Sequence, residues 1–297
     1  MVLSRTGGRY LVWVEGQPVE AVLPGRTKHR SPETVLVGDR VRLWCGDEST
    51  TTIQEVLPRR SLLQRRNPGR LRGERPVAAN LDQVVVVGAA RMPDWDPYLI
   101  DRFIAVAEAN RLPVRVVVNK SDLEPEAAAC GDPYRAAGYE VLATSVVTGV
   151  GLAELRGVLG GRISLFTGPT GVGKSSLLNA LVPGLRLRTA TVSQRNHAGR
   201  HTTVAAEMHP FAPDGFVVDT PGLRDIGLWG LRPHDVAAAF PDVGRVAQGC
   251  RFDDCRHGEE PGCAVREAVE AGTLHASRYD SFRTMLGEAA AAARPWD

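Results

Sequence analysis

The sequence predicts a multi-domain protein in which a small N-terminal β-barrel precedes a central α/β domain and a C-terminal helical domain that binds a metal ion. Three observations support this prediction. Short alternating strand patterns end near residue 76, apolar runs then alternate with helical patterns, and the last sixty residues carry a Cys/His cluster but no strand pattern. The length of 297 residues suits about two domains with room for a small third one. We expect the domains at 1–76, 77–232 and 233–297.

The composition is that of an ordinary soluble protein, with 43% hydrophobic and 24% charged residues. The longest apolar run, residues 84–90, is far shorter than the ~20 residues of a membrane-spanning helix. The N-terminus has no apolar segment of signal-peptide length. Five cysteines are too few for a disulfide scaffold. We therefore expect a cytoplasmic protein without a membrane partner.

The first domain combines a barrel pattern with positive charge. Residues 10–14, 34–37 and 40–44 alternate polar and apolar side chains, and Gly and Pro punctuate them, which is typical of a small antiparallel barrel. Residues 1–76 hold 14 Lys and Arg against 8 Asp and Glu, a net charge of +6, whereas the remainder has a net charge of −4. This imbalance is the electrostatic footprint of a nucleic-acid-binding domain.

The RNA contacts of this domain have two interpretations. Aromatic side chains in the barrel either stack on RNA bases or belong to the core of the barrel. Arginines after the barrel either neutralise RNA phosphates or lie exposed to solvent in a linker. The aromatic candidates are Tyr10, Trp13 and Trp44. The arginine candidates, in a stretch predicted to be a linker, are Arg59, Arg60, Arg65, Arg66, Arg70 and Arg72.

The central domain is predicted to contain a mainly parallel sheet covered by helices on both faces, because continuous apolar strands alternate with helical segments. The predicted strands are 83–87, 114–118, 140–144, 163–167 and 216–218, and the predicted helices include 98–110, 152–158 and 174–181.

A phosphate-binding loop lies between one predicted strand and the next helix. Residues 168–175 fit the pattern G-x-x-x-x-G-K-[ST] in the strand–loop–helix context that the motif requires. Its backbone N–H groups and the helix N-terminus are suited to phosphate oxygens. Lys174 is expected to bridge the β- and γ-phosphates, and the hydroxyl of Ser175 to bind Mg²⁺. The predicted phosphate-binding residues are Gly168, Pro169, Thr170, Gly171, Val172, Gly173, Lys174, Ser175 and Ser176.

A second motif, Asn119-Lys120-Ser121-Asp122, follows the predicted strand 114–118 and selects guanine. The carboxylate of Asp122 can accept hydrogen bonds from both the ring N–H and the amino group of guanine. Adenine offers no such pair, so the buried carboxylate would remain unpaired against it. Asn119 is expected to connect neighbouring loops, and the stem of Lys120 to lie along the base. Ser145, after another strand, is expected to close over the guanine.

The γ-phosphate and Mg²⁺ have candidate ligands further along the chain. Asp219 begins the sequence Asp-Thr-Pro-Gly after a predicted strand and is expected to hold the metal, while the N–H of Gly222 meets the γ-phosphate. The polar segment 194–203 has no strand pattern and is expected to supply Thr202 or Thr203 to Mg²⁺ and the γ-phosphate.

A Cys/His cluster marks the C-terminal domain. Cys250, Cys255, His257 and Cys263 supply three thiolates and one imidazole within fourteen positions. Zinc sites of this composition are four-coordinate and structural. The segment has too few apolar residues to fold alone, so metal binding and folding should be coupled. The alternative is three unrelated buried cysteines.

The order of the motifs identifies a family. Most guanine-nucleotide switch proteins place the phosphate loop first, but here N-K-S-D at 119 precedes the loop at 168 and D-T-P-G at 219 comes last. This circularly permuted order, with a barrel before it and a Cys/His cluster after it, resembles the RsgA (YjeQ/EngC) family over essentially the whole chain. The resemblance implies an OB-type β-barrel, a permuted α/β P-loop GTPase domain and a helical zinc-binding domain with one structural Zn²⁺.

The resemblance also implies a function. Members of this family hydrolyse GTP with Mg²⁺ when stimulated by the small ribosomal subunit, during late maturation of that subunit, and the barrel docks on ribosomal RNA. We expect the same partners here and a monomeric chain. Two other classes remain open: a GTP-dependent switch with a non-ribosomal target, and an RNA-binding zinc protein with a degenerate nucleotide site.

Two positions of the sequence bear on the catalytic residue. Leu223 stands where many related GTPases carry a glutamine that positions water, and the resembled family also has an apolar residue there. His201 matches the histidine that this family is proposed to use instead; the alternative is a loop histidine without a catalytic part. The run His201-Thr202-Thr203 departs from the three threonines more usual in the family, which leaves open which threonine meets the metal.

Overall fold

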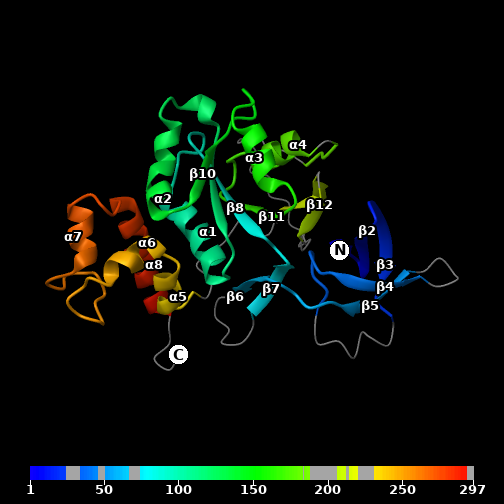
Figure 1. Cartoon of the computed structure of the whole chain (residues 1–297), viewed down its shortest axis with the longest axis horizontal. Helices are drawn as coiled ribbons and strands as arrows, with labels where there is room; N and C mark the ends of the chain where they lie inside the picture. Colours follow the sequence, from blue (N-terminus) through cyan, green and yellow to red (C-terminus); the bar gives the residue numbers. More distant parts are fainter. Residues whose placement is uncertain are drawn as a thin grey trace, which may run out of the picture.

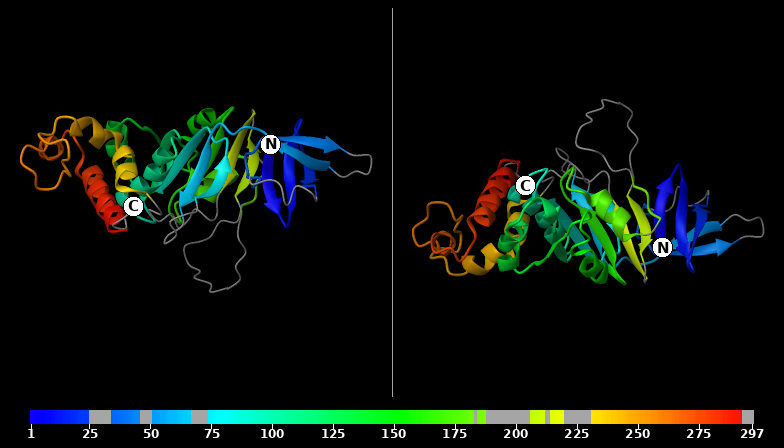
Figure 2. Two further views of the ribbon diagram at one scale, coloured as in Figure 1. Left: turned by 90° about the horizontal axis from the view of Figure 1, so that it is seen from below. Right: turned by 90° about the horizontal axis from the view of Figure 1, so that it is seen from above.

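The computed structural model has three parts in a row (Figure 1). The N-terminal strands lie at one end, the α/β domain lies in the middle, and the C-terminal helices lie at the other end, as two further views confirm (Figure 2). The structure describes residues 1–24, 34–45, 51–66, 74–182, 184–187, 206–211, 214–219 and 231–292. Within these ranges, no helix has both the length and the apolar character needed to cross a membrane.

The N-terminal part is a five-stranded sheet in the order β1-β2-β3-β5-β4. Its outer edges approach each other just before β4, since the N–H of Val2 donates to the carbonyl of Asp39 (2.8 Å) and the N–H of Gly38 donates to the carbonyl of Val2 (2.9 Å). The predicted barrel is therefore confirmed, although 34–37 forms an isolated bridge at Val37 and not the predicted strand. The strands are β1 (Val2–Thr6), β2 (Arg9–Val14), β3 (Gln17–Val22), β4 (Val41–Cys45) and β5 (Thr51–Val56).

The Arg-rich stretch after the barrel is not simply a linker, which corrects the prediction. Strands β6 (Leu62–Arg66) and β7 (Glu74–Ala79) pair as an antiparallel hairpin. Arg59 is also structural, because its guanidinium binds both carboxylate oxygens of buried Asp39, at 2.7 and 2.9 Å. An arginine that neutralises a buried carboxylate is held in place by the barrel and is a poor candidate for a free phosphate ligand.

The central sheet has the order β10-β9-β8-β11-β13-β12, parallel except for β12. Helix α1 (Pro97–Ala109) packs on one face, and α3 (Leu152–Leu159) and α4 (Lys174–Leu181) pack on the other, as the sequence predicts. The predicted strands are confirmed, but β12 is a strand that the sequence did not indicate. The strands are β8 (Gln83–Ala89), β9 (Val114–Asn119), β10 (Glu140–Ala143), β11 (Ile163–Thr167), β12 (Glu207–Phe211) and β13 (Gly215–Asp219).

The C-terminal part is helical in its described residues, as predicted. A cluster of buried side chains centred on Phe240 and Phe282 forms its core and extends to Ala105 of α1. The remaining helices are α2 (Asp132–Ala137), α5 (Pro233–Ala238), α6 (Pro241–Ala247), α7 (Ala264–Glu270) and α8 (Ala276–Ala292), with short 3₁₀ turns η2 (Ser121–Leu123) and η3 (Ala127–Gly131).

Candidate guanine-nucleotide site and metal centre

The predicted nucleotide motifs converge on one edge of the central sheet. The parallel strands β9, β10, β11 and β13 end, respectively, at Asn119, before Thr144, before Gly168 and at Asp219. Because carboxyl ends of parallel strands share one edge, this places all the described motif residues together, where open α/β sheets bind ligands. Strand register adds detail, since Asp219 pairs with Phe166, two residues before the phosphate loop.

Three glycines let the phosphate loop turn close to its neighbours. Gly168, Gly171 and Gly173 all have positive φ, at 137°, 84° and 95°. A Cβ on Gly168 would lie 2.0 Å from the carbonyl oxygen of Val87, and one on Gly173 would lie 2.5 Å from Nδ2 of Asn119. Glycine is therefore required by space as well as by backbone conformation at both positions.

Lys174 begins helix α4, and its ammonium group turns back over the loop. Nζ donates to the carbonyls of Gly168 and Pro169, at 2.6 Å each. A positive charge held against the loop and next to a helix N-terminus makes this an anion-binding position. Ser175 and Ser176 follow in the first turn of α4 and are half-buried.

Asn119 and Lys120 connect the guanine motif to the phosphate loop. The amide of buried Asn119 donates to the carbonyl of Val172 (2.8 Å) and accepts from the hydroxyl of Thr144 (3.0 Å). Nζ of Lys120 donates to the carbonyl of Gly171 at 2.8 Å. Burial lowers the pKa of Lys120, an effect that nearby Asp122 opposes. Asn119 thus connects three loops, as the sequence predicts.

Asp122 is positioned by Ser145. The Ser145 hydroxyl donates to Oδ1 of Asp122 at 2.5 Å and accepts from the N–H of Thr148 at 3.1 Å. Ser145 is fully buried, and Asp122 lies in η2 at the surface. The contact orients one carboxylate oxygen and leaves the other lone pairs for a donor in the site.

Some predicted residues cannot be placed. His201, Thr202, Thr203, Gly222 and Leu223 lie outside the residues that the structure describes. Asp219 is described, and 7% of its surface is exposed at the end of β13. The geometry of the γ-phosphate side therefore rests on Asp219 and the phosphate loop alone.

Sequence reasoning missed a contribution from the segment between β8 and α1. The carbonyl of Met92 accepts a hydrogen bond from Nζ of Lys120. Arg91 forms an ion pair with Glu124 at 2.7 Å, directly after η2. No sequence motif signals either contact, because one involves a backbone carbonyl and the other a single exposed arginine.

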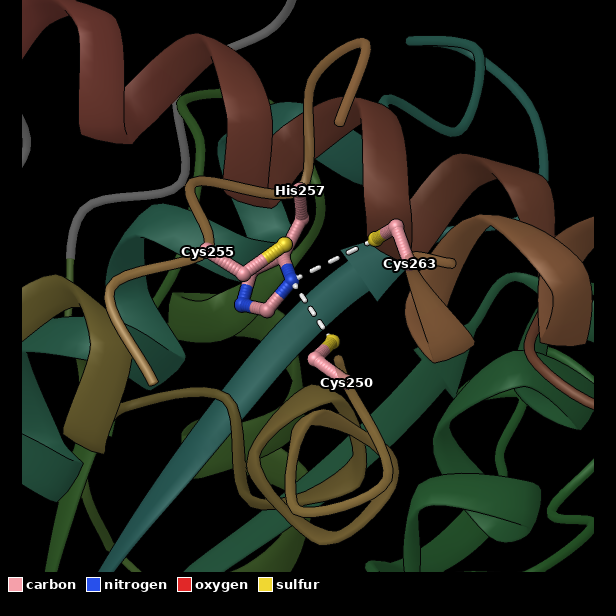
Figure 3. A group of neighbouring side chains, drawn as sticks. All are labelled: Cys250, Cys255, His257 and Cys263. Atoms are coloured by element: carbon pink, nitrogen blue, oxygen red, sulfur yellow. Dashed lines mark hydrogen bonds between the residues drawn. The ribbon is translucent and has the colours of Figure 1, made fainter. Parts of the chain in front are cut away.

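The four predicted metal ligands meet in the C-terminal part (Figure 3). Their ligand atoms all lie within 4.8 Å of one another. Nδ1 of His257 is 3.5 Å from Sγ of Cys250 and 3.6 Å from Sγ of Cys263. A tetrahedral ion with usual Zn–N and Zn–S bonds would separate nitrogen and sulfur by about 3.6 Å. The residues therefore fit a four-coordinate metal ion.

The loop that carries His257 is fixed by contacts outside the ligand set. Glu260 accepts from the N–H groups of Arg256 (3.0 Å) and Gly258 (2.6 Å), and the hydroxyl of Tyr279 donates to the carbonyl of His257 (2.6 Å). Burial lowers the pKa of His257, which favours the neutral imidazole that binds metal. Outer contacts of this kind orient metal ligands.

The permuted sheet, the guanine motif and the phosphate loop define a circularly permuted P-loop GTPase. The sequence model of the family described as "RsgA GTPase" matches residues 56–229. The "Small ribosomal subunit biogenesis GTPase RsgA" of Gemmatimonas aurantiaca is 50% identical over 295 residues, covering 97% of this chain and 96% of that protein. The protein of the same name from Moorella thermoacetica is 42% identical and covers 99% and 98%.

Two solved structures agree with this assignment. YjeQ from Thermotoga maritima superposes with a TM-score of 0.78 at 34% identity, over 97% of both chains. YloQ, described as a circularly permuted GTPase, superposes with a TM-score of 0.74 at 27% identity, over 99% of this chain and 95% of that one. The chain belongs to the RsgA GTPase family, and the resemblance found in the sequence is confirmed.

Proposed function

We propose that this chain hydrolyses GTP to GDP and phosphate when activated by the small ribosomal subunit, and that it acts in late maturation of that subunit. The GTPase proposal rests on one observation: the guanine motif and the phosphate loop meet at one edge of the sheet. There Asn119 binds the carbonyl of Val172, and Ser145 binds Asp122. The ribosomal partner rests on the names of relatives that match the chain over nearly its full length.

Each site residue has a proposed role. Asp122 selects guanine, Lys120 lies along the base, and the loop 168–176 wraps the phosphates with Lys174 at the β- and γ-phosphates. Ser175 and Asp219 supply the oxygen ligands that Mg²⁺ prefers. Bound Mg²⁺ neutralises charge that develops on the phosphate oxygens. Thr202 or Thr203, Gly222 and His201 complete the γ-phosphate side in this proposal.

The remaining assignments follow from composition and chemistry. The Cys/His cluster is proposed to hold one structural Zn²⁺, because three thiolates and an imidazole suit zinc. The chain is proposed to be a cytoplasmic monomer with domains at 1–76, 77–232 and 233–297. The barrel is proposed to bind ribosomal RNA. Tyr10 is 2% exposed and belongs to the core, whereas Trp44 is 56% exposed and remains available for stacking.

The first experiment measures GTP turnover by the purified protein with and without small ribosomal subunits. We expect a low basal rate that rises many-fold with small subunits and does not rise with large subunits or with ATP as substrate. Lys174→Ala, which removes the charge at the phosphates, should abolish the stimulated rate. A rate that is the same with and without ribosomes would leave the GTPase assignment standing and remove the ribosomal partner.

A second experiment tests guanine selection by Asp122. The variant Asp122→Asn replaces an acceptor by a donor, so it should bind GDP at least 100-fold more weakly, since unpaired buried polar groups are costly. It should gain affinity for xanthosine diphosphate, which has a carbonyl where guanine has an amino group. Asp280→Asn, an equal change at an exposed position of α8, is the control. Unchanged GDP affinity in Asp122→Asn would remove Asp122 from the base site.

A further inference from the structure

The segment that enters α1 contacts the nucleotide loops on one side. The carbonyl of Met92 accepts from Lys120, a Cβ added at Gly171 of the phosphate loop would lie 3.5 Å from Pro93, and Arg91 pairs with Glu124. The backbone N–H of Ala90 also donates to the carbonyl of Asn119 (2.8 Å). Residues 90–96 thus lie beside both the guanine motif and the phosphate loop.

The same segment is held firmly to the sheet. The ring of Trp95 lies over Gly88, where an added Cβ would come within 2.3 Å of the indole. Trp95 also meets Tyr134 edge to face, with ring centroids 5.8 Å apart. The carboxylate of Asp96 then caps α1 by accepting from the N–H of Leu99 (3.1 Å). Trp95 and Asp96 therefore connect this segment to the sheet and to the first turn of α1.

The first turns of α1 bind the C-terminal helices. The carboxylate of Asp101 accepts from Nη1 of Arg278 in α8, and both side chains are buried. Arg278 also forms a bidentate pair with Asp242 of α6, at 2.9 Å for each bond. One turn earlier, the hydroxyl of Tyr98 donates to Glu288 of α8 (2.6 Å).

In this joint one guanidinium faces two buried carboxylates. Burial alone would lower the pKa of Arg278, but the hydrogen bonds to Asp242 and the charge of Asp101 hold it above its usual value. Burial raises the pKa of Asp101 to about 6, and the charge of Arg278 opposes this shift. The bidentate contact with Asp242 fixes the plane of the guanidinium, so its remaining nitrogen faces Asp101 of α1.

We propose that residues 90–101 couple guanine-nucleotide binding to docking of the C-terminal helices, with Arg278 as the positioning residue at the far end. This inference rests on the proposed nucleotide site. When Arg278 holds Asp101, it fixes α1 and therefore the carbonyl of Met92 that receives Lys120. Coupling between two sites is reciprocal, so nucleotide at Lys120 also stabilises docking of α8.

The position of the contacts predicts which nucleotides are affected. Lys120 lies beside the base in the proposed site, and Pro93 lies beside Gly171 of the loop. GDP and a non-hydrolysable GTP analogue share these parts, so both should be affected equally.

The experiment compares GDP affinity in the full-length protein and in Asp101→Asn. This variant removes the negative charge from the contact across the joint and leaves only a weaker amide acceptor for Arg278, while Arg278 stays paired with Asp242 inside the C-terminal part. We expect the Kd for GDP and for the GTP analogue to rise at least fivefold, the lower end of common couplings. Asp280→Asn is the matched control and should bind as the wild type does.

A second readout tests reciprocity. GDP should slow hydrogen exchange of α8 amides in the wild type and in Asp280→Asn, but not in Asp101→Asn. If Asp101→Asn does not fold, Tyr98→Phe replaces it, with a two- to threefold rise in Kd and a weaker exchange effect.

Three results are decisive against the inference. Unchanged GDP affinity in a folded Asp101→Asn protein would overturn it, as would a loss confined to the GTP analogue. Failure of the wild type to bind GDP would instead refute the proposed nucleotide site, and the coupling would fall with it.

Discussion

The two ends of the α/β domain are joined to their neighbours by different chemistry. On the barrel side, Leu3 and Trp13 pack with Met208 and Phe216 of β12 and β13, and the rings of Trp13 and Phe216 meet edge to face at 6.4 Å. On the C-terminal side, apolar contacts surround a fully buried arginine that binds two carboxylates.

This difference in contacts affects how the barrel and the C-terminal helices are each oriented on the α/β domain. Apolar burial is non-directional, so the contact of Trp13 with Phe216 does little by itself to set the orientation of the barrel. The contact across the joint, from Arg278 to Asp101, is a buried ion pair, and breaking it leaves an uncompensated charge. The C-terminal helices are therefore oriented by a charged contact, whereas neutral hydrogen bonds accompany the apolar contacts at the barrel junction, such as that from the Asn80 amide to the carbonyl of Gly38 (2.8 Å).

The largest effect that separates the two ends should come from metal removal. Binding of a structural zinc ion supplies about 10 kcal/mol of folding free energy in small zinc domains. Chelation should therefore remove hydrogen-exchange protection from residues 250–263, while exchange in β1 and β2 stays unchanged. Zinc should restore the protection.

Two single cysteine substitutions, one inside and one outside the cluster, provide a matched comparison for this prediction. Cys263→Ser should lose the bound metal and behave as the chelated protein does, whereas Cys130→Ser, which lies outside the cluster, should retain one ion. Loss of protection at both ends would show that the two ends do not fold separately.

Breaking the charged joint should have the next largest effect. Arg278→Met leaves Asp101 and Asp242 buried without a partner, at a cost of about 3–5 kcal/mol. Hydrogen exchange of α8 amides measures this loss locally. Arg9→Ala, which removes an exposed pair with Glu20 on the barrel, should change stability by only about 0.3 kcal/mol.

An apolar version of the joint sharpens the same prediction. Replacing all three groups, with Arg278→Met, Asp101→Leu and Asp242→Leu, removes the unpaired charges. It should recover most of the lost stability, because apolar replacements of buried ion networks are often neutral or stabilising. Stability as low as in Arg278→Met would show that packing, not charge, holds this joint.

The smallest effect is expected at the apolar junction. Trp13→Ala removes a half-buried ring and should cost about 2 kcal/mol, less than the loss of a fully buried tryptophan. Trp44→Ala, at an exposed position of β4, should stay within about 0.5 kcal/mol of the wild type. Urea unfolding followed by tryptophan fluorescence separates the two, and equal costs would contradict the packing described here.

The central domain was predictable because its strands are buried on both faces. β8 is apolar from Val84 onward, β9 and β11 are mainly apolar, and the glycine loop before α4 has a pattern set by phosphate chemistry. β12 escaped prediction because Glu207 and Pro210 interrupt its apolar residues, as an antiparallel edge strand allows. The hairpin β6–β7 escaped because its arginines and proline look like a linker.

The metal ligands and nucleotide loops were predictable because spacing determines their chemistry. The contact of Arg278 with Asp101 was not, because 177 positions separate the two residues and no pattern marks a buried arginine. The contact of the Met92 carbonyl with Lys120 was equally unpredictable, because every residue has a backbone carbonyl and no residue type marks this one. Contacts between distant elements depend on tertiary packing that one sequence does not display.

The three parts lie in a row, so the molecule is elongated (Figure 2). The N-terminal strands and the C-terminal helices lie at opposite ends, and the α/β domain separates them. A tilt of either outer part on the middle one changes the span between the two tips. For a partner that contacts both outer parts, a small rotation beside the α/β domain would change the distance between its two contact sites. Fluorescent labels on β5 and α7 would measure that distance directly.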